Sequence, residues 1–281
     1  MSPSWFDHSV VRFITGTAAA ILIAAVAWRA RALVPSGAIA AIVTGALVVG
    51  CGGWWAGVLL VTFFITSSAI SRAGKQPSRD LLPVRGSQRD AIQVLANGGV
   101  AAICALALAI TGHAAWTVAL AASLATANAD TWATEIGRLS GQRPRSIVTL
   151  RPVLPGTSGG VSFAGTIAAF AGAALIGIVA VTGWNQDWLA NPAPASDLAH
   201  LLMIVTGCGF AGSLVDSLLG ATVQAQYRCP TCGKTTESPT HTCGTATTLV
   251  RGIRWVTNDV VNVTSILVAT GLAGWFVHAI S

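Results

Sequence analysis

The amino-acid sequence predicts an all-α fold: a polytopic transmembrane helical bundle of about eight spans, with a short zinc-knuckle-like cytoplasmic loop. Hydrophobic residues make up 53% of the 281 residues, charged residues only 9%, and the mean hydropathy is +0.67. A soluble domain carries about 25% charged residues. A chain so poor in charge cannot cover a surface that faces water, so lipid must be its solvent. Residues 1–281 are therefore expected to form a single integral membrane domain.

Apolar runs of about 17–25 residues mark the spans, because a helix of that length crosses the hydrocarbon core. Residues 37–71 form one run interrupted at 51–55, where glycines predict a tight hairpin. The start of the chain lacks the features of a signal peptide, so the first span is expected to remain as an anchor. The predicted spans are 9–28, 37–52, 54–71, 91–111, 114–129, 161–182, 200–222 and 260–280, with seven or nine spans as alternatives.

The positions of lysine and arginine predict the orientation, because cytoplasmic loops carry an excess of both. Fifteen of the sixteen basic residues lie in loops on one side of the predicted topology, and Arg12 alone lies on the other. We assign the basic side to the cytoplasm, which places the protein in the cytoplasmic membrane. The net charge of +6 follows from this asymmetry. It indicates a surface for anionic lipid headgroups or phosphorylated substrates and no nucleic-acid partner.

Polar residues near the span ends are the main functional signal, because charged and amide side chains in lipid are costly. They form five groups, and each group lies at the basic end of its span. The groups were identified from residue type and the orientation from lysine and arginine, so their agreement indicates one shared site at the cytoplasmic face. The residues are Arg89, Asn128, Asp130, Glu135, the segment 156–160, Asp216, Gln224, Asn258, Asp259 and Asn262.

The carboxylates in these groups predict a magnesium site. Carboxylate oxygens are hard ligands that bind Mg²⁺ together with the phosphates of a substrate. We assign Asp130, Glu135 and Asp216 as catalytic residues and Mg²⁺ ligands, and Asp259 as a further Mg²⁺ ligand. A purely structural role for Asp130 and Glu135 is the alternative.

The other polar residues predict a region that binds phosphate. The sequence GTSGG at 156–160 has no side-chain bulk and precedes a helix, so its backbone N–H groups can bind an anion. Together with arginines and carboxylates, it predicts metal-assisted phosphoryl transfer. No GxxxxGK[ST] motif occurs, which excludes a standard P-loop, and close helix packing is the alternative for the glycines. The predicted substrate-binding residues are Arg89, Asn128, Arg143, Arg145, Gly156, Thr157, Ser158, Gly159, Gly160, Gln224, Asn258 and Asn262.

The loop at 224–259 contains a CxxC…HxC pattern. Its members are Cys229, Cys232, His241 and Cys243, which supply four ligands of the kinds that Zn²⁺ prefers. Thiols stay reduced in a cytoplasmic loop. We therefore expect a structural Zn²⁺ that holds the loop over the site, with a metal-free loop as the alternative.

Four sequence blocks, TANADTWATEIG, LPGTSGGVSFAGT, SLVDSLLGATVQAQY and NDVVN, resemble the membrane-protein family known as domain of unknown function 92. The family includes plant phytyl-phosphate kinase and human transmembrane protein 19. The resemblance implies that a nucleoside triphosphate phosphorylates a prenyl monophosphate to the diphosphate. The positions that match the motifs are Asp130, Glu135, Thr157, Ser158, Asp216 and Gln224. The cysteine loop does not occur throughout that family, which argues against an essential catalytic role for it.

The leading hypothesis is thus a lipid-phosphate kinase that uses CTP or a similar nucleotide and a prenyl monophosphate such as phytyl phosphate. Its acceptor phosphate would lie among Arg89, Arg143 and Arg145. A transporter or scramblase of a phosphorylated lipid is the rival from another class, but it would place polar residues near the midplane of the bilayer. A CTP-dependent cytidylyltransferase and a lipid-alcohol kinase are further alternatives.

Overall fold

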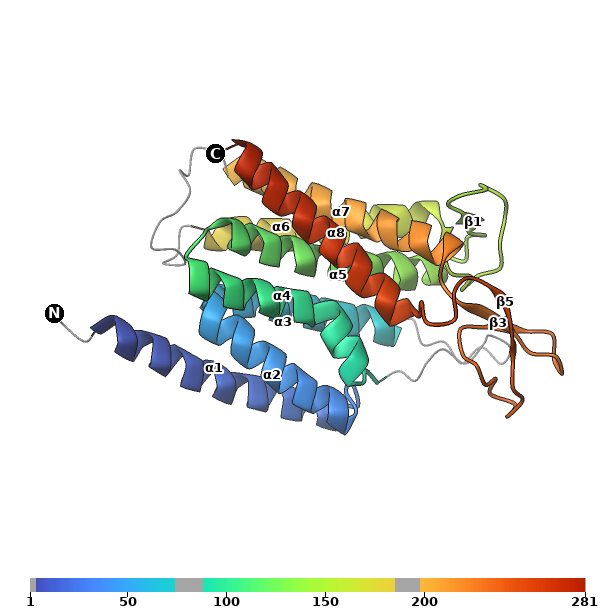
Figure 1. Ribbon diagram of the computed structural model, residues 1–281, viewed down its shortest axis with the longest axis horizontal. Helices are drawn as coiled ribbons and strands as arrows, with labels where there is room; N and C mark the ends of the chain where they lie inside the picture. The colour runs from blue at the N-terminus through green and yellow to red at the C-terminus, as the bar shows by residue number, and fades with distance from the viewer. Residues whose placement is uncertain (1–3, 74–87, 185–197, 281) are drawn as a thin grey trace.

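The computed structural model describes residues 4–73, 88–184 and 198–280. Within these ranges it contains eight long helices, which confirms the predicted all-α bundle (Figure 1). Seven of them are long and apolar enough to cross a membrane, and α5 is the exception. The helices are α1 (Ser4–Arg29), α2 (Pro35–Gly52), α3 (Trp54–Ala73), α4 (Ala91–Thr111), α5 (Ala115–Leu139), α6 (Phe163–Gly183), α7 (Leu198–Thr222) and α8 (Asn258–Ile280).

The predicted hairpin between the second and third spans is confirmed. Gly53 alone separates α2 from α3. Its backbone φ of 93° lies in a region that residues other than glycine rarely adopt. Its backbone N–H donates to the carbonyl of Val49 at 3.0 Å and closes the end of α2. One residue therefore reverses the chain between two helices.

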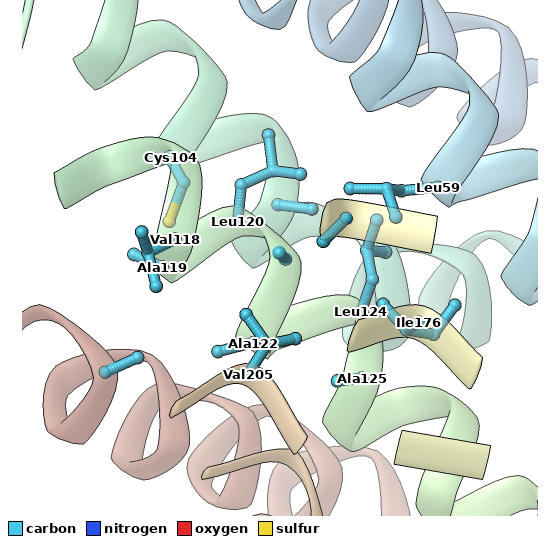
Figure 2. Packing of buried hydrophobic residues seen from close by; sticks show 14 of the residues in the cluster. Leu59, Cys104, Val118, Ala119, Leu120, Ala122, Leu124, Ala125, Ile176 and Val205 are labelled. Atoms are coloured by element: carbon cyan, nitrogen blue, oxygen red, sulfur yellow. The ribbon is translucent and has the colours of Figure 1, made fainter. Parts of the chain in front are cut away.

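Helix α5 is the centre of the bundle. It packs against α3, α4, α6, α7 and α8, and residues 117–129 are all buried. Figure 2 shows Leu120 and Leu124 of α5 among Leu59 of α3, Ile176 of α6 and Val205 of α7. Because protein surrounds α5, it does not need the apolar surface that lipid-facing helices require. This explains why the most buried helix has the least apolar composition.

Helix α5 extends ten residues beyond the predicted end of the fifth span at residue 129, to Leu139. Asp130 and Glu135 therefore lie in the last turns of this helix. Polar residues made the apolar run end early, but they do not break a helix that is shielded by its neighbours. The last turns of α5 consequently carry these carboxylates in fixed register with the buried core.

Five short strands lie at one end of the bundle, opposite the two termini (Figure 1). We call this end the strand end. In the α5–α6 loop, β1 (Arg145–Ser146) pairs antiparallel with β2 (Gly160–Val161). In the α7–α8 loop, β3 (Gln226–Arg228) lies between β4 (Thr235–Thr236) and β5 (Thr248–Arg251) and is antiparallel to both. Two of the predicted basic loops thus lie together, whereas Lys75, Arg79 and Arg85 fall outside the described residues.

Candidate functional site

Two aspartates from different helices meet near the strand end. The carboxyl groups of Asp130 on α5 and Asp216 on α7 lie within hydrogen-bonding reach of each other. Ser265 of α8 donates its hydroxyl to Asp216 Oδ2 at 3.2 Å. The side-chain nitrogen of Asn262 faces two acceptors. It donates to the same Asp216 oxygen at 2.9 Å and to the carbonyl of Asn258 at 3.1 Å. Three helices therefore bring together and orient the aspartate pair.

Glu135 lies further along α5 and has arginine partners. Its carboxylate accepts from Arg138 Nη1 at 3.4 Å and attracts the guanidinium of Arg89. That guanidinium lies 5.5 Å from the ring centre of Phe63 and 6.0 Å from that of Phe64. Burial lowers the pKa of Arg89, whereas the charge of Glu135 raises it. Arg89 is thus a partly buried cation near Glu135 of α5, and an arginine in such a position can pair with a phosphate.

The glycine-rich segment 156–160 is pressed against the end of α7. Its backbone is left-handed at Gly156 (φ 84°) and Gly159 (φ 77°), and an added Cβ at Gly159 would overlap the backbone of Ala221. The N–H groups of Thr157 and Gly160 donate to carbonyls of the same loop. Within the described part of the chain, those of Ser158 and Gly159 have no acceptor. Two successive free N–H groups beside a left-handed residue can bind an anion.

Glu237 and Arg251 belong to this region, although the sequence did not indicate them. Glu237 Oε1 accepts a hydrogen bond from Ser158 Oγ at 2.6 Å and one from Gln224 Nε2 at 2.8 Å. Its charge also acts on Asp216. Arg251 Nη2 donates to the carbonyls of Gly220 at 2.8 Å and Ser158 at 3.3 Å. One available signal was composition, since Glu237 is one of only ten acidic residues in the chain.

Asn128 of α5 forms hydrogen bonds to two other helices. Its side chain is fully buried, at 0% exposure, and its amide nitrogen donates to the carbonyl of Gly172 on α6 at 2.8 Å. Its amide oxygen accepts from Thr66 at 3.0 Å and Ser67 at 3.3 Å, both on α3. Asn128 therefore joins three helices, and its predicted contact with substrate stays a prediction.

Replacing Asn128 by alanine should destabilise the bundle by about 2 kcal/mol, because several interhelical hydrogen bonds are lost together. Thermal unfolding in detergent, followed by tryptophan fluorescence, measures this. Ser123→Ala is the matched control, since Ser123 is equally buried on α5 but bonds only to Leu120 of its own helix. Equal melting temperatures for the two variants would contradict the bridging role.

The other predicted residues lie at the same end with weaker links to the aspartate pair. Arg143 and Arg145 are exposed in the α5–α6 loop, and Arg145 donates to a carbonyl of its own loop at 2.9 Å. Asn258 begins α8, and Asp259 is buried in the first turn of that helix. Their contacts with substrate or Mg²⁺ stay predictions.

The predicted zinc ligands do come together. One ligand atom each from Cys229, Cys232, His241 and Cys243 lies within 4.8 Å of the other three, so the group can hold a metal ion. The sulfurs of Cys229 and Cys243 are 3.6 Å apart. Tetrahedral coordination with Zn–S bonds of about 2.3 Å would place them about 3.8 Å apart. We call these four residues the cysteine–histidine group.

The backbone around the cysteine–histidine group has the form of two similar turns. Each half of the pattern ends in a glycine with left-handed backbone, Gly233 at φ 68° and Gly244 at φ 82°. Hydrogen bonding with Thr245 and His241 lowers the pKa of Cys243 to about 6. A thiol with this pKa is largely ionised at neutral pH, which is the form that binds metal.

A bundle of eight long helices with a polar site at one end defines an integral membrane protein. The chain belongs to the family described as integral membrane protein DUF92, whose profile matches residues 18–270. This confirms the resemblance found in the sequence motifs.

Three relatives are similar over most of the chain. Protein PGR of Arabidopsis thaliana is 35% identical over 240 residues, covering 78% of this chain and 81% of its own length. An uncharacterized membrane protein of Methanocaldococcus jannaschii is 29% identical, over 76% of this chain and 84% of its own length. An uncharacterized membrane protein of Synechocystis is 30% identical, over 70% of this chain and 74% of its own length. No solved structure matches.

Proposed function

We propose that this protein is a kinase that transfers a phosphoryl group from CTP or a similar nucleotide to a prenyl monophosphate such as phytyl phosphate. The observation that carries the proposal is the aspartate pair beside a glycine-rich segment with two free backbone N–H groups. We take the aspartate pair as the element that would bind a cation and the glycine-rich segment as the element that would bind an anion. Hydrogen bonds through Glu237 join Ser158 of that segment to Gln224 after α7, the helix that carries Asp216.

The aspartate pair supports the Mg²⁺ assignment. Two carboxylates in contact repel each other unless a proton or a cation lies between them. Carboxylates from Asp130 and Asp216 would hold Mg²⁺, which supplies charge neutralisation on the nucleotide phosphates. Ser265 and Asn262 keep Asp216 oriented for this purpose. Glu135 and Asp259 remain candidates for further ligands.

The chemistry requires no catalytic base. A phosphate oxygen of the acceptor, already ionised at neutral pH, attacks the γ-phosphorus of the nucleotide. The bond between that phosphorus and the bridging oxygen breaks, and the nucleoside diphosphate leaves. Arg89 and the exposed Arg143 and Arg145 would balance charge on the phosphates. Positioning and charge neutralisation then supply most of the acceleration.

We further propose that the cysteine–histidine group binds Zn²⁺ and that the strand end faces the cytoplasm. Four protein ligands leave no open position on the metal, which is typical of a structural zinc site. The distribution of lysine and arginine supports the orientation.

The test uses purified protein in lipid nanodiscs with Mg²⁺ and either phytyl or geranylgeranyl monophosphate. Other nucleoside triphosphates are tried beside CTP. Label from γ-labelled nucleotide is expected in a prenyl diphosphate. Label from α-labelled CTP in the lipid would instead indicate a cytidylyltransferase. In a parallel reaction with phytol as the acceptor, transfer of γ-label to phytol would indicate an alcohol kinase. If folded protein transfers no label with any pair, the kinase proposal is contradicted, and lipid-phosphate flux across vesicles becomes the next measurement.

A further inference from the structure

The part of the α7–α8 loop between residues 229 and 250 has almost no apolar core of its own, and the buried apolar residues of this loop lie outside it, at Ala225, Tyr227 and Val256. Within residues 229–250, Cys229 and His241 alone are buried, and both belong to the cysteine–histidine group. Ordering a segment of this length costs conformational entropy, which buried contacts must offset. Three short strands supply few such contacts. A metal ion that joins four side chains would supply the missing stabilisation.

Glu237 lies inside the segment that the metal would order, between the ligands Cys232 and His241. Its Oε1 atom accepts from Ser158 Oγ at 2.6 Å and from Gln224 Nε2 at 2.8 Å. A single carboxylate oxygen therefore joins the glycine-rich segment to the end of α7.

The link is one that the site cannot replace easily. Gln224 is only 2% exposed, so its amide would be left without a partner if Glu237 moved away. The second tie to the glycine-rich segment comes from the same loop, because Arg251 of β5 donates to the carbonyl of Ser158. Both ties therefore depend on the order of the loop that contains the cysteine–histidine group.

We propose that the metal ion in the cysteine–histidine group controls the phosphate-binding region by holding Glu237 against Ser158 and Gln224. Glu237 acts as a positioning residue, and the metal acts on the site through it. The functional consequence rests on the proposed function, but the structural link does not.

The experiment measures two quantities in the full-length protein: bound zinc by mass spectrometry, and amide hydrogen exchange of peptides that span 154–161. In Glu237→Ala, zinc should stay near that of the wild type, while exchange in 154–161 becomes about ten- to a hundredfold faster because the charged hydrogen-bond acceptor is lost. In Cys232→Ser, zinc should be lost and exchange should rise to a similar extent. The double variant should exchange no faster than Cys232→Ser, because both changes break one pathway.

Two further variants separate positioning from general damage. Glu237→Gln keeps an acceptor oxygen and should restore slow exchange in 154–161. Lys234→Ala removes an exposed charge in the same loop. Lys234 bonds to Cys229 and Cys232 through its backbone, which alanine keeps, so neither quantity should change. Removing zinc from the wild type with a chelator should speed exchange in 154–161, and adding zinc back should slow it again. This control shows the effect of the metal even if Cys232→Ser misfolds.

Three results would overturn the proposal. The first is that the wild type binds no zinc after Zn²⁺ is supplied. The second is that residues 154–161 of Glu237→Ala exchange at the wild-type rate. The third is that exchange in 154–161 stays unchanged after zinc is removed. None of these readouts uses phosphoryl transfer. A protein that passes them but transfers no label would contradict the kinase proposal alone.

Discussion

Replacing Asp130 by asparagine is expected to lower phosphoryl transfer by about a hundred- to a thousandfold, the scale on which loss of one charge-stabilising group acts. Asparagine has the same shape and can still donate a hydrogen bond to Asp216, so the contact between α5 and α7 should persist. The negative charge that would bind Mg²⁺ is lost. Turnover should be measured over a range of Mg²⁺ concentrations, with the folded state checked by size-exclusion chromatography and thermal unfolding.

Asp90→Asn is the matched control for this change. Asp90 is also a carboxylate, but it lies at the start of a helix, where it forms the N-cap of α4 and accepts from the backbone N–H of Gln93 at 2.9 Å. Asparagine caps helices about as well as aspartate does. Transfer by Asp90→Asn should therefore match that of the wild type. Undiminished transfer by Asp130→Asn would remove the aspartate pair from the mechanism.

The bundle was predictable because lipid imposes a simple rule on sequence. Helices that face lipid must be apolar over about 20 residues, and seven helices obey that rule. Helix α5 departs from it because other helices surround it, which is a property of the folded state. The apolar run that marks the predicted span accordingly ends at 129, ten residues before the helix ends at Leu139.

Asn128 and Glu237 show why the site was only partly predictable. A polar residue in a span indicates a partner, but the sequence does not say whether that partner is a substrate or another helix. For Asn128 the partners lie on α3 and α6, far away in sequence. Glu237 reaches Ser158 only because the loop between α7 and α8 returns over the α5–α6 loop. The four residues of the cysteine–histidine group were found because their spacing is a local property of the chain.

Gly159→Ala should lower phosphoryl transfer by at least about a hundredfold, the loss expected when reacting groups are displaced by about 1 Å. Gly159 has a φ of 77°, and an added Cβ would overlap the backbone of Ala221 at the end of α7. Backbone cannot move aside as a flexible side chain can. The glycine-rich segment must therefore shift away from α7, which moves its free N–H groups relative to Asp216.

Gly156→Ala separates this displacement from backbone strain. Gly156 has a similar φ of 84° in the same segment, but an added Cβ would meet nothing within 4 Å. Alanine there should cost about 1–2 kcal/mol of stability from the left-handed backbone alone. We expect a moderate loss of transfer by Gly156→Ala and a far larger one by Gly159→Ala, with nucleotide binding weakened mainly in the second. Equal losses would mean that contact with α7 is irrelevant to phosphate binding, and that the conformation of the segment alone matters.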